Sequence, residues 1–109
     1  MAKLKISLQK TLVHAGGYAN DTNDLGGETY KGISRKFHPI WSGWEQIDIH
    51  KQECNFPKNL DQDTKMQNQI EQFYYTNFWS PLKADQIQNQ RIADSIFDFA
   101  VNAGIKASV

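Results

Sequence analysis

The amino-acid sequence predicts a single, mainly α domain that also carries a small lobe made of a loop and a hairpin. Its length of 109 residues is that of one domain. Apolar residues recur at helical spacing through most of the chain, whereas residues 18–32 break this pattern with Asn, Asp, Thr and Gly. Hydrophobic residues, many of them aromatic, make up 39% of the chain, so a folded core is expected.

The first helix is predicted from three leucines at helical spacing, Leu4, Leu8 and Leu12. It is expected to end near His14–Ala15, with Gly16 in the left-handed conformation that commonly stops a helix. The turn-rich stretch from Tyr18 to Gly32 then predicts a loop with a short hairpin at its end. Because helical patterns flank this stretch on both sides, it is typical of a site rather than of a linker.

Shorter helical segments are predicted next. Ser34 is expected to cap a segment through Phe37, which Pro39 interrupts. A further helix follows from the three-to-four spacing of Trp41, Trp44, Ile47 and Lys51. After a break at residues 55–59, Asp61 or Asp63 is expected to cap another helix, which Pro81 stops. The apolar stripe of that helix is Met66, Ile70, Phe73, Tyr74 and Phe78.

The last long helix is predicted over Asp85–Ala103, with Gly104 at its end. It carries two apolar stripes, one of Ile92, Ile96, Phe99 and Ala100 and one of Ala93, Phe97 and Val101. A helix that is apolar on two sides is usually central in the core, so both stripes are expected to be buried. We expect the whole chain, residues 1–109, to form this one domain.

Composition argues against several classes of function. Twelve basic and twelve acidic residues give a formal net charge of zero, whereas a duplex-binding domain usually carries a basic excess. Cys54 is the single cysteine, and His14, His38 and His50 lack the close spacing of metal ligands, so neither a metal nor another cofactor is expected. The first residues lack the apolar run of a secretion signal, and no membrane-spanning stretch follows.

The end of the first helix and the acidic loop after it have a chemical meaning when taken together. Cleavage of a glycosidic bond needs one carboxylic acid that protonates the leaving oxygen and a second carboxylate that activates water or stabilises positive charge. A helix end packed on a core can hold the acid in a dry place, which raises its pKa. A polar loop can present the second carboxylate, and a Thr hydroxyl can hold the water.

The order of residues in this region resembles that of glycoside hydrolase family 108, the muramidases once described as secretion activator proteins. The resemblance rests on Gly16-Gly17-Tyr18, Asn20-Asp21, Asp24, Gly26-Gly27, Thr29 and Gly32-Ile33. Further matches are residues 34–39, Phe73-Tyr74 with Trp79, and residues 97–104. A pattern this long and ordered is more specific than any single short motif. The resemblance implies a lysozyme-like fold that cuts the β-1,4 bond between N-acetylmuramic acid and N-acetylglucosamine in peptidoglycan.

By position, the resemblance puts the family's general acid at residue 15. The spacing is also similar to that of phage-type lysozymes, and this looser likeness implies that Asp24 is the second carboxylate and Thr29 a water-holding residue. Substrate contacts are expected from Tyr18, Asn20, Asp21, Gly27 and Asn102. Each has a structural alternative. Asp21 and Asp24 are common turn residues, Thr29 favours strands, and Gly27 serves backbone geometry. Tyr18 can close the loop over the core, and Asn102 can bond a neighbouring loop.

Two departures from the family pattern stand out. Residue 15 is Ala where the family has Glu, and the chain is expected to be truncated at Val109, before the peptidoglycan-binding domain that commonly follows in the family. A methyl group cannot protonate a leaving oxygen, so this copy is expected to be nearly inactive. A single change in an intact motif is more typical of a deliberate knock-out than of decay, with natural loss as the alternative. Glu28, beside Thr29 in the loop, is considered as a replacement acid and disfavoured because it is expected to be solvated.

Two other functions are weighed beside the disabled hydrolase. A non-catalytic module could keep the groove and bind peptidoglycan glycan strands without cutting them. A purely structural part of a phage or a secretion apparatus would have no glycan affinity, and nothing in the composition favours it. The hydrolase is expected to be made in the cytoplasm and to reach the periplasmic cell wall through a holin-type or dedicated secretion route, without inserting into the membrane.

Overall fold

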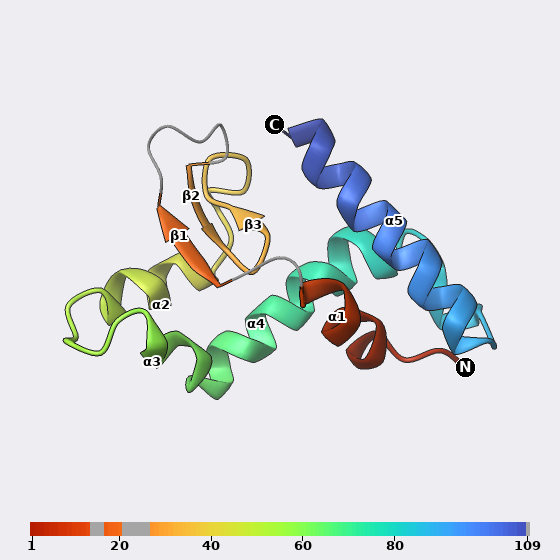
Figure 1. Ribbon diagram of the computed structural model, residues 1–109, viewed down its shortest axis with the longest axis horizontal. Helices are drawn as coiled ribbons and strands as arrows, with labels where there is room; N and C mark the ends of the chain where they lie inside the picture. The colour runs from red at the N-terminus through yellow and green to blue at the C-terminus, as the bar shows by residue number, and fades with distance from the viewer. Residues whose placement is uncertain (14–16, 21–26, 109) are drawn as a thin grey trace.

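The computed structural model describes residues 1–13, 17–20 and 27–108, with side chains described up to residue 103. The fold is mainly helical with one small antiparallel sheet, as the sequence predicts. Helix α4 (Thr64–Tyr74) runs along one side of the molecule and connects its two halves. The sheet and helices α2 (Gly43–His50) and α3 (Lys58–Asp61) form one half, and helices α1 (Leu4–Leu12) and α5 (Gln90–Ser108) form the other (Figure 1).

The two terminal helices pack against each other. Leu4 and Leu8 of α1 are buried, as are Ala93, Phe97 and Val101 of α5. At the centre of this contact the buried Ser7 hydroxyl donates to Asp94 Oδ1 at 2.5 Å, and Lys10 Nζ lies 2.6 Å from Asp94 Oδ2. The predicted apolar face of the first helix is therefore confirmed, while its expected end at His14–Ala15 and Gly16 lies outside the described residues.

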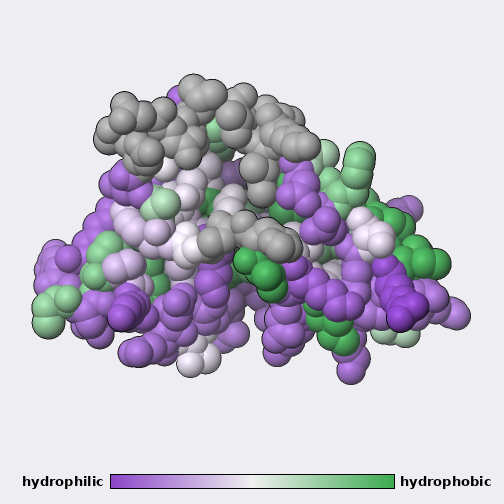
Figure 2. Space-filling model, viewed as in Figure 1, coloured by the Kyte–Doolittle hydropathy of each residue, from purple (hydrophilic) through white to green (hydrophobic). Residues whose placement is uncertain are grey.

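The last helix differs from its prediction at both ends and on one face. It begins at Gln90 rather than Asp85, because Ile87 is extended and its carbonyl accepts a hydrogen bond from Ala2 N, while the Asn89 side chain accepts from Ile92 N. It continues through Gly104, which therefore does not end it. The stripe of Ile92, Ile96, Phe99 and Ala100 is not buried as expected: the first three residues are exposed and Ala100 is half-buried. Figure 2 shows hydrophobic atoms gathered over this side of the molecule.

The sheet contains three short strands in the order β1 (Tyr18–Asn20), β2 (Glu28–Tyr30) and β3 (Ile33–Ser34). All neighbours are antiparallel, with Ala19 opposite Thr29 and Thr29 opposite Ser34. The short hairpin predicted at the end of the polar stretch is confirmed, because β2 and β3 pair across the turn at Lys31 and Gly32. Strand β1, which was not predicted, adds a third strand to it. The helical segment expected from Ser34 to Phe37 is wrong, because Ser34 belongs to the sheet and residues 35–37 form a turn.

Helices α2 and α4 agree with their sequence patterns, whereas the short helix α3 was not predicted and begins at Lys58, inside the break expected at residues 55–59. Helix α2 carries Trp44 and Ile47 into the core, and Asp63 caps α4 by accepting a hydrogen bond from Met66 N at 3.2 Å. A wide π-helical turn, Tyr75–Trp79, extends α4 almost to Pro81. A short 3₁₀ turn, Ala84–Gln86, precedes α5.

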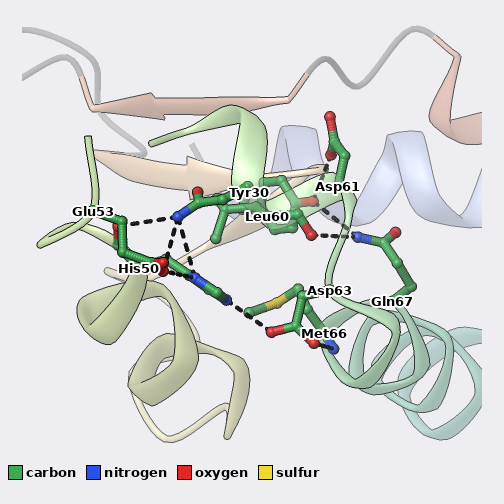
Figure 3. Close-up of polar contacts among 9 residues, drawn as sticks. Tyr30, His50, Glu53, Leu60, Asp61, Asp63, Met66 and Gln67 are labelled. Atoms are coloured by element: carbon green, nitrogen blue, oxygen red, sulfur yellow. Dashed lines mark hydrogen bonds and ion pairs between the residues drawn. The ribbon is translucent and has the colours of Figure 1, made fainter. Parts of the chain in front are cut away.

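Helix α4 is fixed to the sheet by side-chain hydrogen bonds as well as by packing. Tyr74 Oη donates to the Lys31 carbonyl at 2.6 Å, in the turn between β2 and β3. Tyr30 Oη donates to Asp61 Oδ1 at 2.8 Å and accepts from Gln67 Nε2 at 3.1 Å (Figure 3). Tyr30 and Tyr74 are both almost fully buried, so these bonds satisfy hydroxyls that would otherwise be costly to bury.

Candidate functional site

The predicted catalytic positions belong to the two connections on either side of strand β1. Residue 15 lies in the connection from α1 to β1, and Asp21 and Asp24 lie in the connection from β1 to β2. All three positions are outside the described residues, so their geometry stays a prediction. The elements that enter and leave both connections are described, and they define the surface on which such a site would be built.

The sheet has two chemically different faces because side chains alternate along a strand. One face carries Glu28 and Tyr30 of β2, and it is turned toward the core, where Tyr30 and Ile33 are almost completely buried. The other face carries Thr29, between its partners Ala19 and Ser34, and is half-buried to exposed. We call this second surface the Thr29 face. The Thr29 side chain and the Glu28 carboxylate therefore project from opposite faces of the sheet.

Glu28 sits inside a network of charged and polar side chains. Its carboxylate accepts hydrogen bonds from Tyr18 Oη at 2.5 Å and Arg35 Nη1 at 3.1 Å, and Lys51 Nζ lies 2.6 Å away. Arg35 also makes a two-pronged pair with Asp48, at 2.7 and 2.8 Å. The network joins strand β2, the turn after β3 and helix α2. The Glu28 side chain is only 12% exposed, so the expected solvated glutamate is instead largely enclosed.

The electrostatics of this network keep its carboxylates ionised. Burial raises the pKa of Glu28, but hydrogen bonds from Lys51, Tyr18 and Arg35 outweigh burial and leave its pKa below the ordinary value. The hydrogen bonds from Arg35 lower the pKa of Asp48 to about 2. A general acid must instead hold a proton near neutral pH. Glu28 is therefore unsuited to replace the missing acid, which agrees with the expectation from the sequence for a different reason.

The described substrate-contact candidates are distributed around the sheet and α5. The Tyr18 ring packs edge-on against Phe56 at 4.8 Å and its hydroxyl bonds Glu28, so it closes the sheet over the core. Asn20 ends β1 and is exposed. Gly27 has a φ of +63°, a conformation that favours glycine, directly before β2. Asn102 is exposed on α5 and donates to the Asp98 carbonyl of its own helix at 2.8 Å.

A groove of about 730 Å³ lies on α4, between this helix and the loop of residues 37–42. We call it the aromatic groove; its lining includes Phe37, His38, Trp41, Asn68, Gln72 and Phe73. A smaller hollow of about 460 Å³ lies between α1 and α4 and includes Lys31 and Val13. Both volumes lie in the range of roughly 300–1,000 Å³ that is typical of small-molecule sites.

Sequence reasoning did not predict the aromatic groove or the Glu28 network. The spacing of Trp41 and Trp44 indicated a helix, but it could not show that Trp41 lies before the helix and lines a groove. Arg35 and Lys51 belong to other segments than Glu28, the turn after β3 and the end of α2, so no pattern within one element predicts the ion pairs. Among the described residues, no three His, Cys, Asp or Glu side chains are arranged to hold a metal ion.

The fold and these surfaces are consistent with a lysozyme-like α+β domain, in which a small antiparallel sheet sits beside a helical body. The chain belongs to the glycosyl hydrolase 108 family, whose model matches residues 8–104. Membership of this family implies a glycoside hydrolase of the muramidase type that acts on a glycan. Neither the curated proteins nor the solved structures contain a match to the chain.

Proposed function

We propose that this chain is the scaffold of an N-acetylmuramidase that cleaves the β-1,4 bond between N-acetylmuramic acid and N-acetylglucosamine in peptidoglycan. Residue 15 is the acid position, Asp24 the second carboxylate and Thr29 the residue that positions water. In this copy Ala15 disables the reaction. The observation that carries the proposal is the match of the family model to residues 8–104, because this range includes all three positions.

The proposed chemistry assigns one task to each position. An acid at residue 15 gives its proton to the leaving oxygen as the glycosidic bond breaks. Asp24 removes a proton from the attacking water or stabilises the positive charge on the sugar. The exposure of the Thr29 face supports the third role, since a hydroxyl there can reach solvent. Without the acid, the rate is expected to fall by roughly 10²–10⁴-fold.

The decisive experiment restores the acid. Ala15→Glu is expected to clear suspended peptidoglycan and to release muropeptides with a muramic-acid reducing end, at a rate at least about 100-fold above that of the present chain. Ala15→Gln is the matched control, because its side chain has the same shape but cannot donate a proton at neutral pH. Equal activity of Ala15→Glu and the present chain would contradict the catalytic assignment.

A second candidate is a glycan-binding module that no longer cuts. One observation favours it, namely that Ala15 has no titratable group. This candidate predicts saturable binding of muropeptides by the present chain, weakened by Tyr18→Ala or Asp24→Asn, and no activity in Ala15→Glu. For either function the proposed place of action is the bacterial cell wall. No helix in the described part of the chain is both long enough and apolar enough to span a bilayer.

A further inference from the structure

We propose that the aromatic groove is a saccharide-binding site for an oligomer of N-acetylhexosamines, separate from the catalytic positions. The choice of this ligand class rests on the proposed function. The described residues that line the groove do not include positions 15, 21 or 24. Its lining combines aromatic rings with side-chain amides, a composition that suits sugars because their C–H faces stack on rings and their hydroxyl and acetamido groups bond amides.

Trp41 is the fixed platform of the groove. Its indole Nε1 donates to the Gln69 carbonyl of α4 at 3.3 Å. Its ring makes edge-on contacts with Trp44 at 5.3 Å and with Phe73 at 6.1 Å. These contacts come from two different helices, so the ring orientation is set before any ligand arrives. Preorganised aromatic side chains bind with little loss of conformational entropy.

Gly43 permits this arrangement. It is the first residue of α2, it is buried, and a Cβ atom added there would collide with the six-membered ring of Trp41. The glycine therefore leaves room for the indole to lie against the start of the helix. An alanine at this position favours the helix itself but displaces the ring. Gly43→Ala thus tests the platform without removing any atom that could contact a ligand.

Helix α4 supplies the polar wall. Asn68 and Gln72 are exposed and lie one helical turn apart on the groove side. Between them Gln69 donates from Nε2 to Ser42 Oγ at 3.1 Å, and its Oε1 is buried with no hydrogen-bond partner among the described residues. The exposed amides of Asn68 and Gln72 are therefore the groups that can bond the hydroxyl and acetamido groups of a sugar.

The charge of the groove agrees with a binding rather than a cutting site. Lys65 is the charged side chain at its rim, and none of the described residues that line the groove is acidic. Glycoside cleavage needs carboxyl groups, so a sugar held here would be retained intact. Burial lowers the pKa of His38, which favours a neutral imidazole beside Phe73 at neutral pH.

The groove is also next to the Thr29 face along the backbone. Ser34 pairs with Thr29 in the sheet, and its carbonyl accepts a hydrogen bond at 2.8 Å from His38 N, which belongs to the groove wall. The aromatic groove and the Thr29 face therefore lie in the same half of the molecule, where one glycan strand could contact both. The aromatic groove would hold sugar units beyond those at the cleavage point.

The test is a titration of the present chain with chitotetraose, an N-acetylglucosamine tetramer, followed by backbone amide chemical shifts. We expect saturable shifts at residues 37–42 and along the groove side of α4. Gln72→Ala should weaken binding about five-fold, the effect of one lost hydrogen bond. Gln88→Ala is the matched control, because Gln88 is exposed and does not line the groove. Gly43→Ala should weaken binding by ten-fold or more, with its folding checked by urea denaturation.

Each other outcome overturns the proposal. Absence of saturable shifts would do so, as would shifts confined to α1 and the sheet. Groove shifts caused by a peptide of the peptidoglycan stem, but not by the sugar, would replace the saccharide assignment. The two experiments distinguish failure of the proposed function from failure of the groove inference. If Ala15→Glu is inactive while the groove still binds chitotetraose, only the proposed function fails. If Ala15→Glu is active and the groove does not respond, only the groove inference fails.

Discussion

At the scale of single residues, Glu28 shows how a carboxylate near a proposed site can be structural. Its partners Tyr18, Arg35 and Lys51 come from three different segments, so it connects the sheet to helix α2. Its position on the core side of the sheet separates it from the Thr29 face. These contacts give the glutamate closest in sequence to the proposed catalytic residues a structural role, and we expect it to take no part in proton transfer.

This assignment makes a prediction for Glu28→Gln. The substitution should lower the free energy of unfolding by about 1–3 kcal/mol, because it removes an enclosed charge from its hydrogen-bond donors. In the Ala15→Glu background it should leave muramidase activity per folded molecule within about two-fold, since no proton-transfer barrier is involved. Urea denaturation and a peptidoglycan-clearing assay measure the two effects. Glu45→Gln, at an exposed position of α2, is the control of equal charge.

The loss of stability caused by Glu28→Gln should also depend on pH. The pKa of Glu28 is lower in the folded chain than in the unfolded chain, so its contribution is present above the unfolded pKa and is lost as pH falls through the folded pKa. The stability difference between the parent and Glu28→Gln should therefore shrink below about pH 4. A large fall in activity at unchanged folding would instead assign Glu28 to the chemistry.

At the scale of secondary-structure elements, the junction of α2, α3 and α4 depends on His50. Its Nδ1 lies 2.5 Å from Glu53 Oε1 and its Nε2 lies 2.8 Å from Asp63 Oδ2. Asp63 is at the same time the cap of α4 (Figure 3). The hydrogen bonds to Asp63 and Glu53 raise the pKa of His50 above its ordinary value of 6.5. The junction is thus stabilised most when the imidazole is protonated.

His50→Gln should reveal this dependence. A raised folded pKa gives stability that is complete below the unfolded pKa, near 6.5, and is lost as pH rises through the folded pKa. The parent should therefore exceed His50→Gln by about 1 kcal/mol near pH 6, and the difference should shrink by pH 9. Urea titrations of both chains across this range measure it, because subtraction cancels the other titrating groups. A difference that is constant with pH would show that the imidazole acts without its charge.

The elements also show what sequence could predict. The Asp63 cap, the α2 pattern and the Pro81 stop are local signals, and all three are confirmed. Helices were also expected to start at Ser34 and Asp85, yet no α-helix begins at either residue, because Ser34 pairs with Thr29 in the sheet and the Ile87 carbonyl accepts a hydrogen bond from Ala2 N. These contacts join segments that are distant in sequence. Of the candidate site, the ordered motif predicted the family, whereas the Glu28 network and the aromatic groove required the tertiary structure.

At the scale of the whole molecule, helix α5 has one apolar stripe in the core and one at the surface. Phe97 is completely buried between Trp79 and Tyr74, with ring centres 5.6 and 6.2 Å away. Phe99, two residues later, is 75% exposed. Sequence gives both stripes the same character, because helical periodicity does not tell which face finds a partner.

The two phenylalanines therefore make a matched pair on one helix. Phe97→Ala should lower the free energy of unfolding by about 3–5 kcal/mol, since it leaves a cavity between α4 and α5. Phe99→Ala should change it by less than about 0.5 kcal/mol. Urea denaturation monitored by circular dichroism compares them. Equal losses would mean that the Phe99 side of α5 is covered in solution.

The wide turn at Tyr75–Trp79 lies at the end of α4, where the helical segment packs on α5. An ordinary α-helix advances about 100° per residue, so residue positions alone fix where each side chain points. In the π-helical turn Ser80 N donates to Tyr75 O at 2.8 Å. The turn holds one additional residue, so the side chains that follow it point in other directions than they would on a continuous α-helix. Before the turn, Phe73 contacts Trp41 on the groove side and Tyr74 contacts Phe97 on α5. Trp79, the last residue of the turn, contacts Phe97 from a second direction. A change of one residue in chain length here would rotate one half against the other.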